Sequence, residues 1–325
     1  MEKILYLQID ADTINSTEVR FLDEFLGKCE LDGFHIMPVK VKANGQFDMD
    51  DHADKEHKKR VHEVAMSLTE KEREQLRDYV KTETDARGLS GLFCVAICQN
   101  QELIDYFRTE GIPVIGYEGG LTHQLVNNWI LLSFESVDFS YLWKVHHRFH
   151  GIPLYIMETE RTIIRELCMD DMDDLFKLYE GEHMTDYMEP LYEREEEESY
   201  EANYIEKVYG FYDYGMWLVF HKETKELIGR AGVESRGGIE HSSRREDDDY
   251  RNDPETVELG YAIKEEYQNK GYATEVCSAI IRYTFDTLGM KRIYAQVDEK
   301  NIPSVKLLKK LNFVQIDTEL YEILN

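Results

Sequence analysis

Short apolar runs alternate with amphipathic segments through residues 1–150. The runs are continuously apolar, as in Leu-Phe-Cys-Val-Ala-Ile at residues 92–97, and the amphipathic segments repeat apolar positions at helical spacing. The predicted strands are residues 4–9, 92–97, 112–117 and 129–133, and the predicted helices are residues 18–26, 102–110 and 141–150. Strand, helix and strand at this spacing indicate βαβ units, so the pattern predicts a Rossmann-like α/β domain with a parallel sheet.

A second pattern fills residues 159–325, after a connector that we interpret as a linker over residues 151–158. The predicted strands are residues 162–167, 216–221, 226–233 and 257–264, then 292–297 and a last one from Phe313; the predicted helices are a first one capped by Asp170, then residues 193–209, 274–288 and 301–311. The strands 216–221 and 226–233 form a predicted hairpin. The sequence therefore predicts two domains.

Three charged segments interrupt these patterns. Residues 50–87 carry an interrupted apolar stripe and predict a helix. Residues 237–255 are polar without periodicity and predict a long exposed loop. The run Glu195–Glu198 predicts a solvated helix face.

The composition is that of a globular protein. Of 325 residues, 42% are apolar and 12% aromatic, and no run reaches the roughly 18 apolar residues of a membrane-spanning helix. Asp10 and Asp12 interrupt the first apolar run too early for a signal peptide, so we expect a cytoplasmic protein. The five cysteines are odd in number and lie mostly in apolar contexts, which favours reduced thiols.

The net charge of −27 narrows the set of partners. Nucleic acid is disfavoured, because a phosphate backbone is bound by clustered Lys and Arg. A cationic substrate such as an amine would be steered toward the protein. Solubility alone is the alternative explanation of the charge. We expect neither nucleic acid nor a membrane as a partner.

The segment Gln268-Asn269-Lys270-Gly271-Tyr272-Ala273 lies between a predicted strand and a predicted helix. A turn that leads into a helix presents unpaired backbone N–H groups and the positive end of the helix dipole. Gly271 allows the backbone to approach a phosphate closely. The glycine spacing fits neither a Walker A loop nor the dinucleotide-binding fingerprint.

This segment resembles the pyrophosphate-binding signature Q/R-x-x-G-x-G/A of GNAT acetyltransferases. Three further segments resemble the ribosomal-protein N-terminal acetyltransferase branch in the expected order: Thr159–Glu166 as its opening strand, Glu258–Ile263 as its central strand, and Asn301–Ser304 with Leu311–Phe313 as its last helix and exit. The resemblance covers about residues 158–316. It implies a mixed-sheet domain that transfers an acetyl group from acetyl-CoA to a primary amine, of a protein N-terminus or a small molecule, by direct attack.

The resemblance also implies how the co-substrate binds. The backbone of Ala262 and Ile263 would pair with the pantetheine arm as an added strand would. The turn that Gln268 opens would hold the pyrophosphate with its amides, and Asn301 would face the acetyl end or serve as a helix N-cap. The residues of the turn are Gln268, Asn269, Lys270, Gly271, Tyr272 and Ala273, with a hydroxyl from Thr274. No metal is expected.

Two residues are expected to assist the chemistry. Glu258 is the candidate general base, provided that it is sufficiently buried; the alternative is a strand-edge charge paired with an Arg such as Arg230. Many members of the family protonate the thiolate with a Tyr, at the position where this chain has Leu308. Ser304 is the substitute in the ribosomal-protein branch, although a plain helix serine is the alternative.

The acceptor is expected to lie against the first two helices and the hairpin of this domain. Candidate wall residues, which would otherwise be core aromatics, are Tyr187, Met188, Glu189, Tyr209, Tyr212, Tyr214 and Trp217.

The first 150 residues carry a weaker resemblance. Asp10, Asp12 and Thr13 after the first strand resemble the aspartate pair of haloacid-dehalogenase-like phosphatases, and Cys98 stands where that family has a hydroxyl. The machinery is incomplete, so we expect a degenerate module for binding, dimerisation or regulation. His146 and His150 lie one helical turn apart, but no Cys or carboxylate completes a metal site.

Two hypotheses about function follow. One is an N-acetyltransferase. The other is a sensor or interaction protein that binds acyl-CoA without turnover and uses a dead phosphatase-like module to contact its partner. Both hypotheses are compatible with a homodimer.

Overall fold

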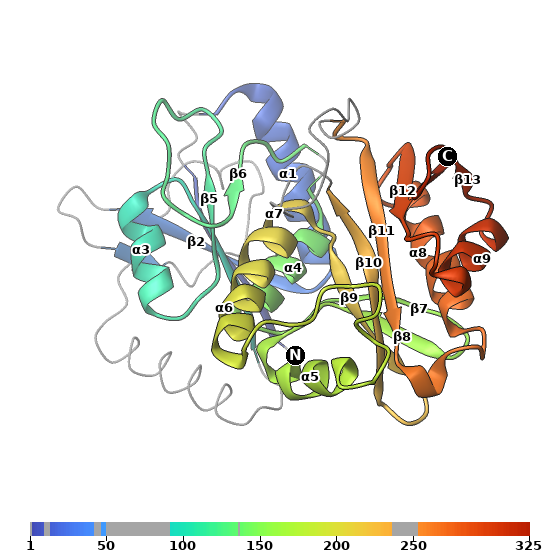
Figure 1. The fold of residues 1–325 in the computed structure, drawn as a ribbon. Helices are drawn as coiled ribbons and strands as arrows, with labels where there is room; N and C mark the ends of the chain where they lie inside the picture. The colour runs from blue at the N-terminus through green and yellow to red at the C-terminus, as the bar shows by residue number, and fades with distance from the viewer. Residues whose placement is uncertain (1, 10–13, 42–46, 50–91, 136, 236–252) are drawn as a thin grey trace. The chain divides into compact units, whose positions relative to one another are not determined.

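The computed structural model describes residues 2–9, 14–41, 47–49, 92–135, 137–235 and 253–325. The chain divides into two compact units, Met1–His150 and Gly151–Asn325, and each has its own sheet and core (Figure 1). The predicted helix at 50–87 and most of the predicted loop at 237–255 lie outside the described residues, as do Asp10, Asp12 and Thr13.

The first unit contains a six-stranded sheet in the order β3-β2-β1-β4-β5-β6. Its strands are β1 (Glu2–Gln8), β2 (Phe34–Val41), β3 (Phe47–Met49), β4 (Leu92–Cys98), β5 (Val114–Tyr117) and β6 (Ile130–Leu131), and its described helices are α1 (Ser16–Leu31), α3 (Gln101–Thr109) and α4 (Phe139–Phe149). All neighbouring strands are parallel except β2 and β3. The predicted Rossmann-like parallel sheet is confirmed. Sequence reasoning missed β2, in which Pro38 interrupts the strand signal.

The histidines of α4 are neutral packing groups. His146 is 5% exposed and stacks on Phe93 of β4 with 4.2 Å between ring centroids. Burial, with smaller contributions from His150 and His147, lowers the pKa of His146 to about 3. Among the described residues, no three His, Cys, Asp or Glu side chains lie together as a set of metal ligands.

The end of β4 does not supply a phosphatase-like hydroxyl. Cys98 pairs with Gln8 of β1 and is fully buried, and burial raises the pKa of its thiol. A protonated, buried thiol is a poor nucleophile and a weak hydrogen-bond donor. The resemblance of this unit to phosphatases therefore stays an expectation.

The second unit contains a mixed eight-stranded sheet in the order β13-β14-β12-β11-β10-β9-β8-β7. Its strands are β7 (Tyr155–Glu158), β8 (Thr162–Arg165), β9 (Met216–His221), β10 (Leu227–Ser235), β11 (Thr256–Ile263), β12 (Arg292–Gln296), β13 (Val314–Gln315) and β14 (Leu320–Leu324). The helices are α5 (Met172–Tyr179), α6 (Arg194–Tyr204), α7 (Gly210–Tyr212), α8 (Tyr272–Asp286) and α9 (Ile302–Lys310), with short turns η1 (Met169–Asp171) and η3 (Glu265–Tyr267) and a π-helix η2 (Ile205–Tyr209). The β11–β12 pair is parallel and the other pairs are antiparallel.

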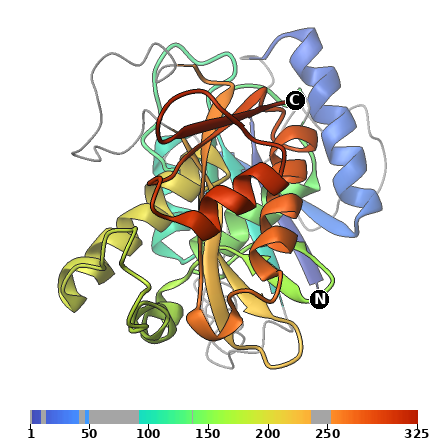
Figure 2. The ribbon, with the colours of Figure 1, turned by 45° about the vertical axis from the view of Figure 1, so that its right-hand side comes forward.

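Helices cover both faces of this sheet (Figures 1 and 2). On one face, Arg230 of β10 reaches Glu201 of α6. On the other face, Trp217 of β9 meets Tyr283 of α8 edge-on, with ring centroids 5.7 Å apart. Because side chains alternate along a strand, these two contacts assign the faces of the residues on β11 and on β10 from Gly229 onward.

The ion pair between Arg230 and Glu201 is buried. Arg230 Nη1 lies 2.5 Å and Nη2 3.2 Å from the two carboxylate oxygens, and the side chains are 9% and 0% exposed. This bidentate geometry is what offsets the cost of taking two charges out of water.

Three local expectations are corrected. Residues 155–158 of the predicted linker form the edge strand β7. The turn before α5 is capped by Cys168 with Asp171, not by Asp170, because the Asp171 carboxylate accepts from the Cys168 N–H at 2.9 Å. Glu197 is not solvated; it is 2% exposed and accepts from the Tyr192 N–H at 2.8 Å, and burial raises its pKa.

The described residues include no helix long and apolar enough to cross a membrane.

The His146 pKa predicts an acid-sensitive unfolding equilibrium. Below the ordinary pKa of 6.5 the unfolded chain binds a proton that the folded chain excludes, so stability falls as the pH drops toward 3. Between pH 7 and pH 5 we expect a loss of about 2 kcal/mol, measured by urea unfolding. His146→Leu should reduce this dependence, and His123→Leu, at an exposed histidine, should leave it unchanged. Equal pH dependence in His146→Leu and the unsubstituted protein would contradict the assignment.

Candidate active site

The strands β11 and β12 pair only at their beginnings. Their register joins Thr256 to Arg292, Val257 to Ile293 and Glu258 to Tyr294, and pairing ends there. On its other edge, β11 pairs with β10 along residues 257–263. The second half of β11 therefore has one open edge, which faces the gap between two diverging parallel strands.

The ladder with β10 decides which backbone groups face this open edge. Lys264 N–H donates to Ile228 C=O at 2.8 Å, and Ile263 is opposite Gly229. Antiparallel ladders alternate, so the N–H and C=O of Ala262 turn toward β10, and those of Tyr261 and Ile263 turn toward the gap. Of the two predicted pantetheine-binding residues, Ile263 thus presents its backbone to the gap and Ala262 does not.

The turn after β11 has the conformation that a phosphate loop requires. Gln268 Nε2 donates to Ile263 C=O at 2.9 Å and so fixes the start of the turn to the end of the strand. Asn269 and Gly271 have φ of 56° and 85°, and Gly271 is the N-cap of α8. The first amides of α8 have no partner within the helix, so this end of α8 can accept an anion.

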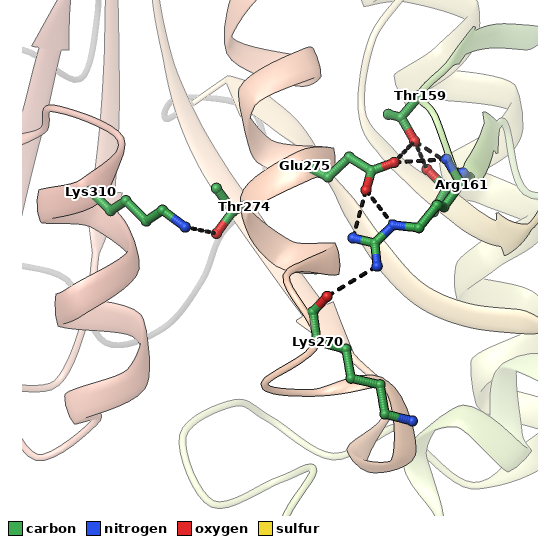
Figure 3. Close-up of polar contacts among 7 residues, drawn as sticks. Thr159, Arg161, Lys270, Thr274, Glu275 and Lys310 are labelled. Atoms are coloured by element: carbon green, nitrogen blue, oxygen red, sulfur yellow. Dashed lines mark hydrogen bonds and ion pairs between the residues drawn. The ribbon is translucent and has the colours of Figure 1, made fainter.

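A residue from the β7–β8 hairpin fixes this turn (Figure 3). Arg161 Nη1 donates to Lys270 C=O at 3.0 Å, and Arg161 Nε and Nη2 each lie 2.7 Å from Glu275 Oε2 in the first turn of α8. The other oxygen of Glu275 accepts from Thr159 Oγ1 at 2.5 Å and from Arg161 N–H at 2.8 Å. Burial alone would raise the pKa of Glu275, but the hydrogen bonds from Thr159 and Arg161 and the charge of Arg161 outweigh it and lower this pKa.

Cationic side chains gather near the same helix end. The Arg161 guanidinium stacks over the Tyr272 ring at 4.0 Å, and Lys310 Nζ at the end of α9 lies 3.4 Å from Thr274 Oγ1 (Figure 3). The Arg161 charge is balanced by Glu275, so Lys310 and the positive end of the α8 dipole are the charges that favour an anionic ligand at this point.

Glu258 lies on the α6 face of the sheet. It is directly opposite Glu234 of β10, whose Oε1 accepts from Tyr204 OH of α6 at 2.6 Å. Glu258 is half-buried. Arg230, the alternative partner expected from the sequence, makes its ion pair with Glu201 instead.

The first turn of α9 lies on the opposite face. Asn301 is its N-cap, and its Oδ1 accepts from Ser304 N–H at 3.2 Å. Leu308 is fully buried in the core. Ser304 is half-buried and lies beside the hydroxyl of Tyr261, which opposes the effect of burial on the pKa of that phenol.

The expected acceptor wall divides into two groups. Trp217, Tyr209 and Tyr214 are buried core residues. Tyr187 is 51% exposed and donates to Lys300 C=O at 3.2 Å. Glu189 is exposed, and Met188 and Tyr212 are half-buried.

Comparison with known proteins identifies the family. Residues 161–314 match the family described as Acetyltransferase (GNAT) domain. The uncharacterised N-acetyltransferase YoaA of Bacillus subtilis (strain 168) is 31% identical over 163 residues, which cover 49% of this chain and 82% of YoaA. The chain belongs to the GNAT acetyltransferase family. It is an acyltransferase, and the activity of this family is transfer of an acetyl group from acetyl-CoA to an amine.

Two other proteins are similar to this chain. The uncharacterised N-acetyltransferase p20 of Bacillus licheniformis is 29% identical over 160 residues, covering 48% of this chain and 80% of p20. Among solved structures, the ribosomal-protein-S5-alanine acetyltransferase of Vibrio fischeri covers 52% of this GNAT chain and 96% of its own, with 19% identity and a TM-score of 0.41.

Sequence reasoning missed two parts of the GNAT site. Arg161 and Glu275 are separated by 114 positions, and Lys310 and Thr274 by 36, so no local pattern could join them. The available signal was the basic charge of Arg161, at the start of the predicted opening strand Thr159–Glu166 of an acidic chain.

The contacts of Arg161 with the turn predict that its loss affects the KM for acetyl-CoA more than the KM for the acceptor. Arg161→Ala should raise the KM for acetyl-CoA about tenfold, because the turn loses bonds to a charged donor, with a smaller effect on the acceptor KM. Arg194→Ala is the matched control, since Arg194 likewise bonds two residues, through the carboxylates of Asp173 and Glu198, but on α6. An equal rise in both variants would contradict a local role for Arg161.

Proposed function

We propose that the second unit transfers the acetyl group of acetyl-CoA to a cationic primary amine by direct attack. The observation that carries this proposal is the open edge of β11 after Glu258, continuous with the turn Gln268–Gly271 and the start of α8. An extended arm fits the edge, and a pyrophosphate fits the helix end that follows it.

The co-substrate is held along this path. The backbone of Ile263, with that of Tyr261, pairs with the pantetheine arm. The amides of residues 269–273, the Thr274 hydroxyl and the positive charge of Lys310 receive the pyrophosphate. Gln268 positions the turn, and Asn301 orders the start of α9 near the acetyl end.

The two faces of β11 divide the chemistry. The amine approaches from the α6 face and reacts as the neutral form, after its ammonium proton has passed to water. Its lone pair attacks the thioester carbonyl, Glu258 takes the second N–H proton directly or through water, the C–S bond breaks, and the sulfur leaves with the bonding electrons. Ser304, on the α9 side, donates a hydrogen bond to the departing sulfur, which takes its proton from solvent. Proximity supplies much of the rate.

Acidic side chains near the site, as well as the net charge of the chain, favour a cationic acceptor. Glu234 and Glu258 are directly opposite on neighbouring strands, so two carboxylates lie together on the α6 face. Two acidic groups at this point attract a protonated amine, of a polyamine or an N-terminal residue.

Turnover tests the proposal. We expect release of CoA thiol with at least one amine from a panel of spermidine, an aminoglycoside and a peptide with a free N-terminus. Glu258→Gln should lower kcat by about 10²- to 10⁴-fold, and Glu319→Gln, at an exposed residue, should not. Acetyl-CoA should also raise the melting temperature of both variants, because Glu258 is not part of its path.

The alternative function gives a different result. A sensor would show the acetyl-CoA-dependent rise in melting temperature without turnover of any amine. No rise in the unsubstituted protein would overturn both functions.

The carboxylates of Glu234 and Glu258 predict that the KM for a cationic acceptor depends on salt. Glu234→Gln keeps an acceptor for the Tyr204 hydroxyl but removes one charge, so the KM for a polycationic acceptor should rise about three- to tenfold at low salt. The difference should narrow at about 0.5 M salt, where charges are screened. A KM that stays unchanged at low salt would show that the acceptor does not bind beside Glu234.

A further inference from the structure

The hydroxyl of Tyr261 is buried and has no hydrogen-bond partner among the described residues. Buried hydroxyl groups are nearly always paired, so an unpaired one calls for a cause. Tyr261 lies on β11, in the half of the strand that has no β12 neighbour.

The side chain of Tyr261 points to the face opposite Glu258. The two residues are three positions apart, and Glu258 is on the α6 face, so alternation turns Tyr261 toward α8 and α9. Its neighbours agree: Cys277 of α8 and Ser304 of α9 both influence the phenol. Cys277 is a buried thiol and a weak acceptor. Ser304 is therefore the better acceptor near this hydroxyl.

We propose that Tyr261 is a positioning residue that donates a hydrogen bond to Ser304 Oγ during acyl transfer and thereby aims the Ser304 O–H at the departing sulfur. This inference rests on the proposed function. It assigns a task to a side chain that the mechanism above uses only through its backbone.

Each of the two hydroxyls can donate or accept, and the proposal assigns the donor role to Tyr261 because of what this does to the Ser304 proton. A phenol has one proton to give, and burial raises the pKa of Tyr261, so the phenol stays protonated at working pH. A serine on a helix otherwise tends to donate to the backbone carbonyl three or four residues before it. If Ser304 Oγ accepts from Tyr261, its own proton stays available for the sulfur. Tyr261 does not give up its proton in the step: the amine proton passes to Glu258, and the thiolate is protonated by solvent.

A double-mutant cycle tests the coupling. The variants are Tyr261→Phe, Ser304→Ala and the double variant, assayed by CoA thiol release with the most active acceptor of the panel. We expect Tyr261→Phe to lower kcat about tenfold while the KM for acetyl-CoA stays within twofold. In the Ser304→Ala background the same change should have no further effect, because the hydroxyl that Tyr261 positions is gone.

The controls separate positioning from packing. Tyr261→Phe should melt at the same or a higher temperature, since it removes a buried hydroxyl that lacks a partner. Tyr321→Phe is the matched control, because Tyr321 is 2% exposed and lies on β14, with β12 between it and β11; its kcat should be unchanged. An unchanged kcat in Tyr261→Phe, or the same tenfold loss in the Ser304→Ala background, would overturn this inference alone. If the unsubstituted protein turns over no amine, the proposed function fails and the inference falls with it.

Discussion

The early end of the pairing between β11 and β12 is the constraint on which the rest of this unit depends. Parallel strands normally continue their ladder, and here it ends at Glu258 and Tyr294. The Ile263 C=O accepts from Gln268 Nε2, but the Ile263 N–H and the backbone of Tyr261 face the gap, and such groups are costly if they meet only apolar side chains. They lie instead beside a turn and a helix end that can accept an anion. The same divergence leaves space for α9 to bring Ser304 to one face while α6 covers the other.

The proposed function requires a strongly acidic chain to bind an anionic co-substrate and still attract a cationic acceptor. In this proposal the two demands are met at separate places. Arg161, Lys310 and the dipole of α8 lie at the helix end, whereas Glu234 and Glu258 lie on the α6 face. Because charges at exposed sites are screened within about 10 Å, each group acts mainly on the part of the substrate pair that it meets.

The order of the elements, the strand-turn-helix around Gly271 and the family could be predicted from local sequence, because each depends on neighbouring residues. Local sequence failed where long-range packing decides. The edge strand β7 has only four residues, so its pairing with β8 decides that it is a strand. Glu197 and Glu201 look like a solvated helix face until Arg230 and the Tyr192 amide are placed beside them. Ala262 was predicted to face the co-substrate, but the register with β10, fixed by Lys264 and Ile228, turns it away.

The spacing of three residues between Glu258 and Tyr261 has a consequence for how this domain can diverge. An odd separation on a strand places the two side chains on opposite faces of the sheet, and point substitutions preserve that separation. Loss or gain of one residue between them would move both groups to the same side and exchange which amides meet the gap. This short stretch of β11 should therefore tolerate changes of residue type far better than changes of length, so gap-free alignment across these positions becomes a criterion for relatives that share its chemistry.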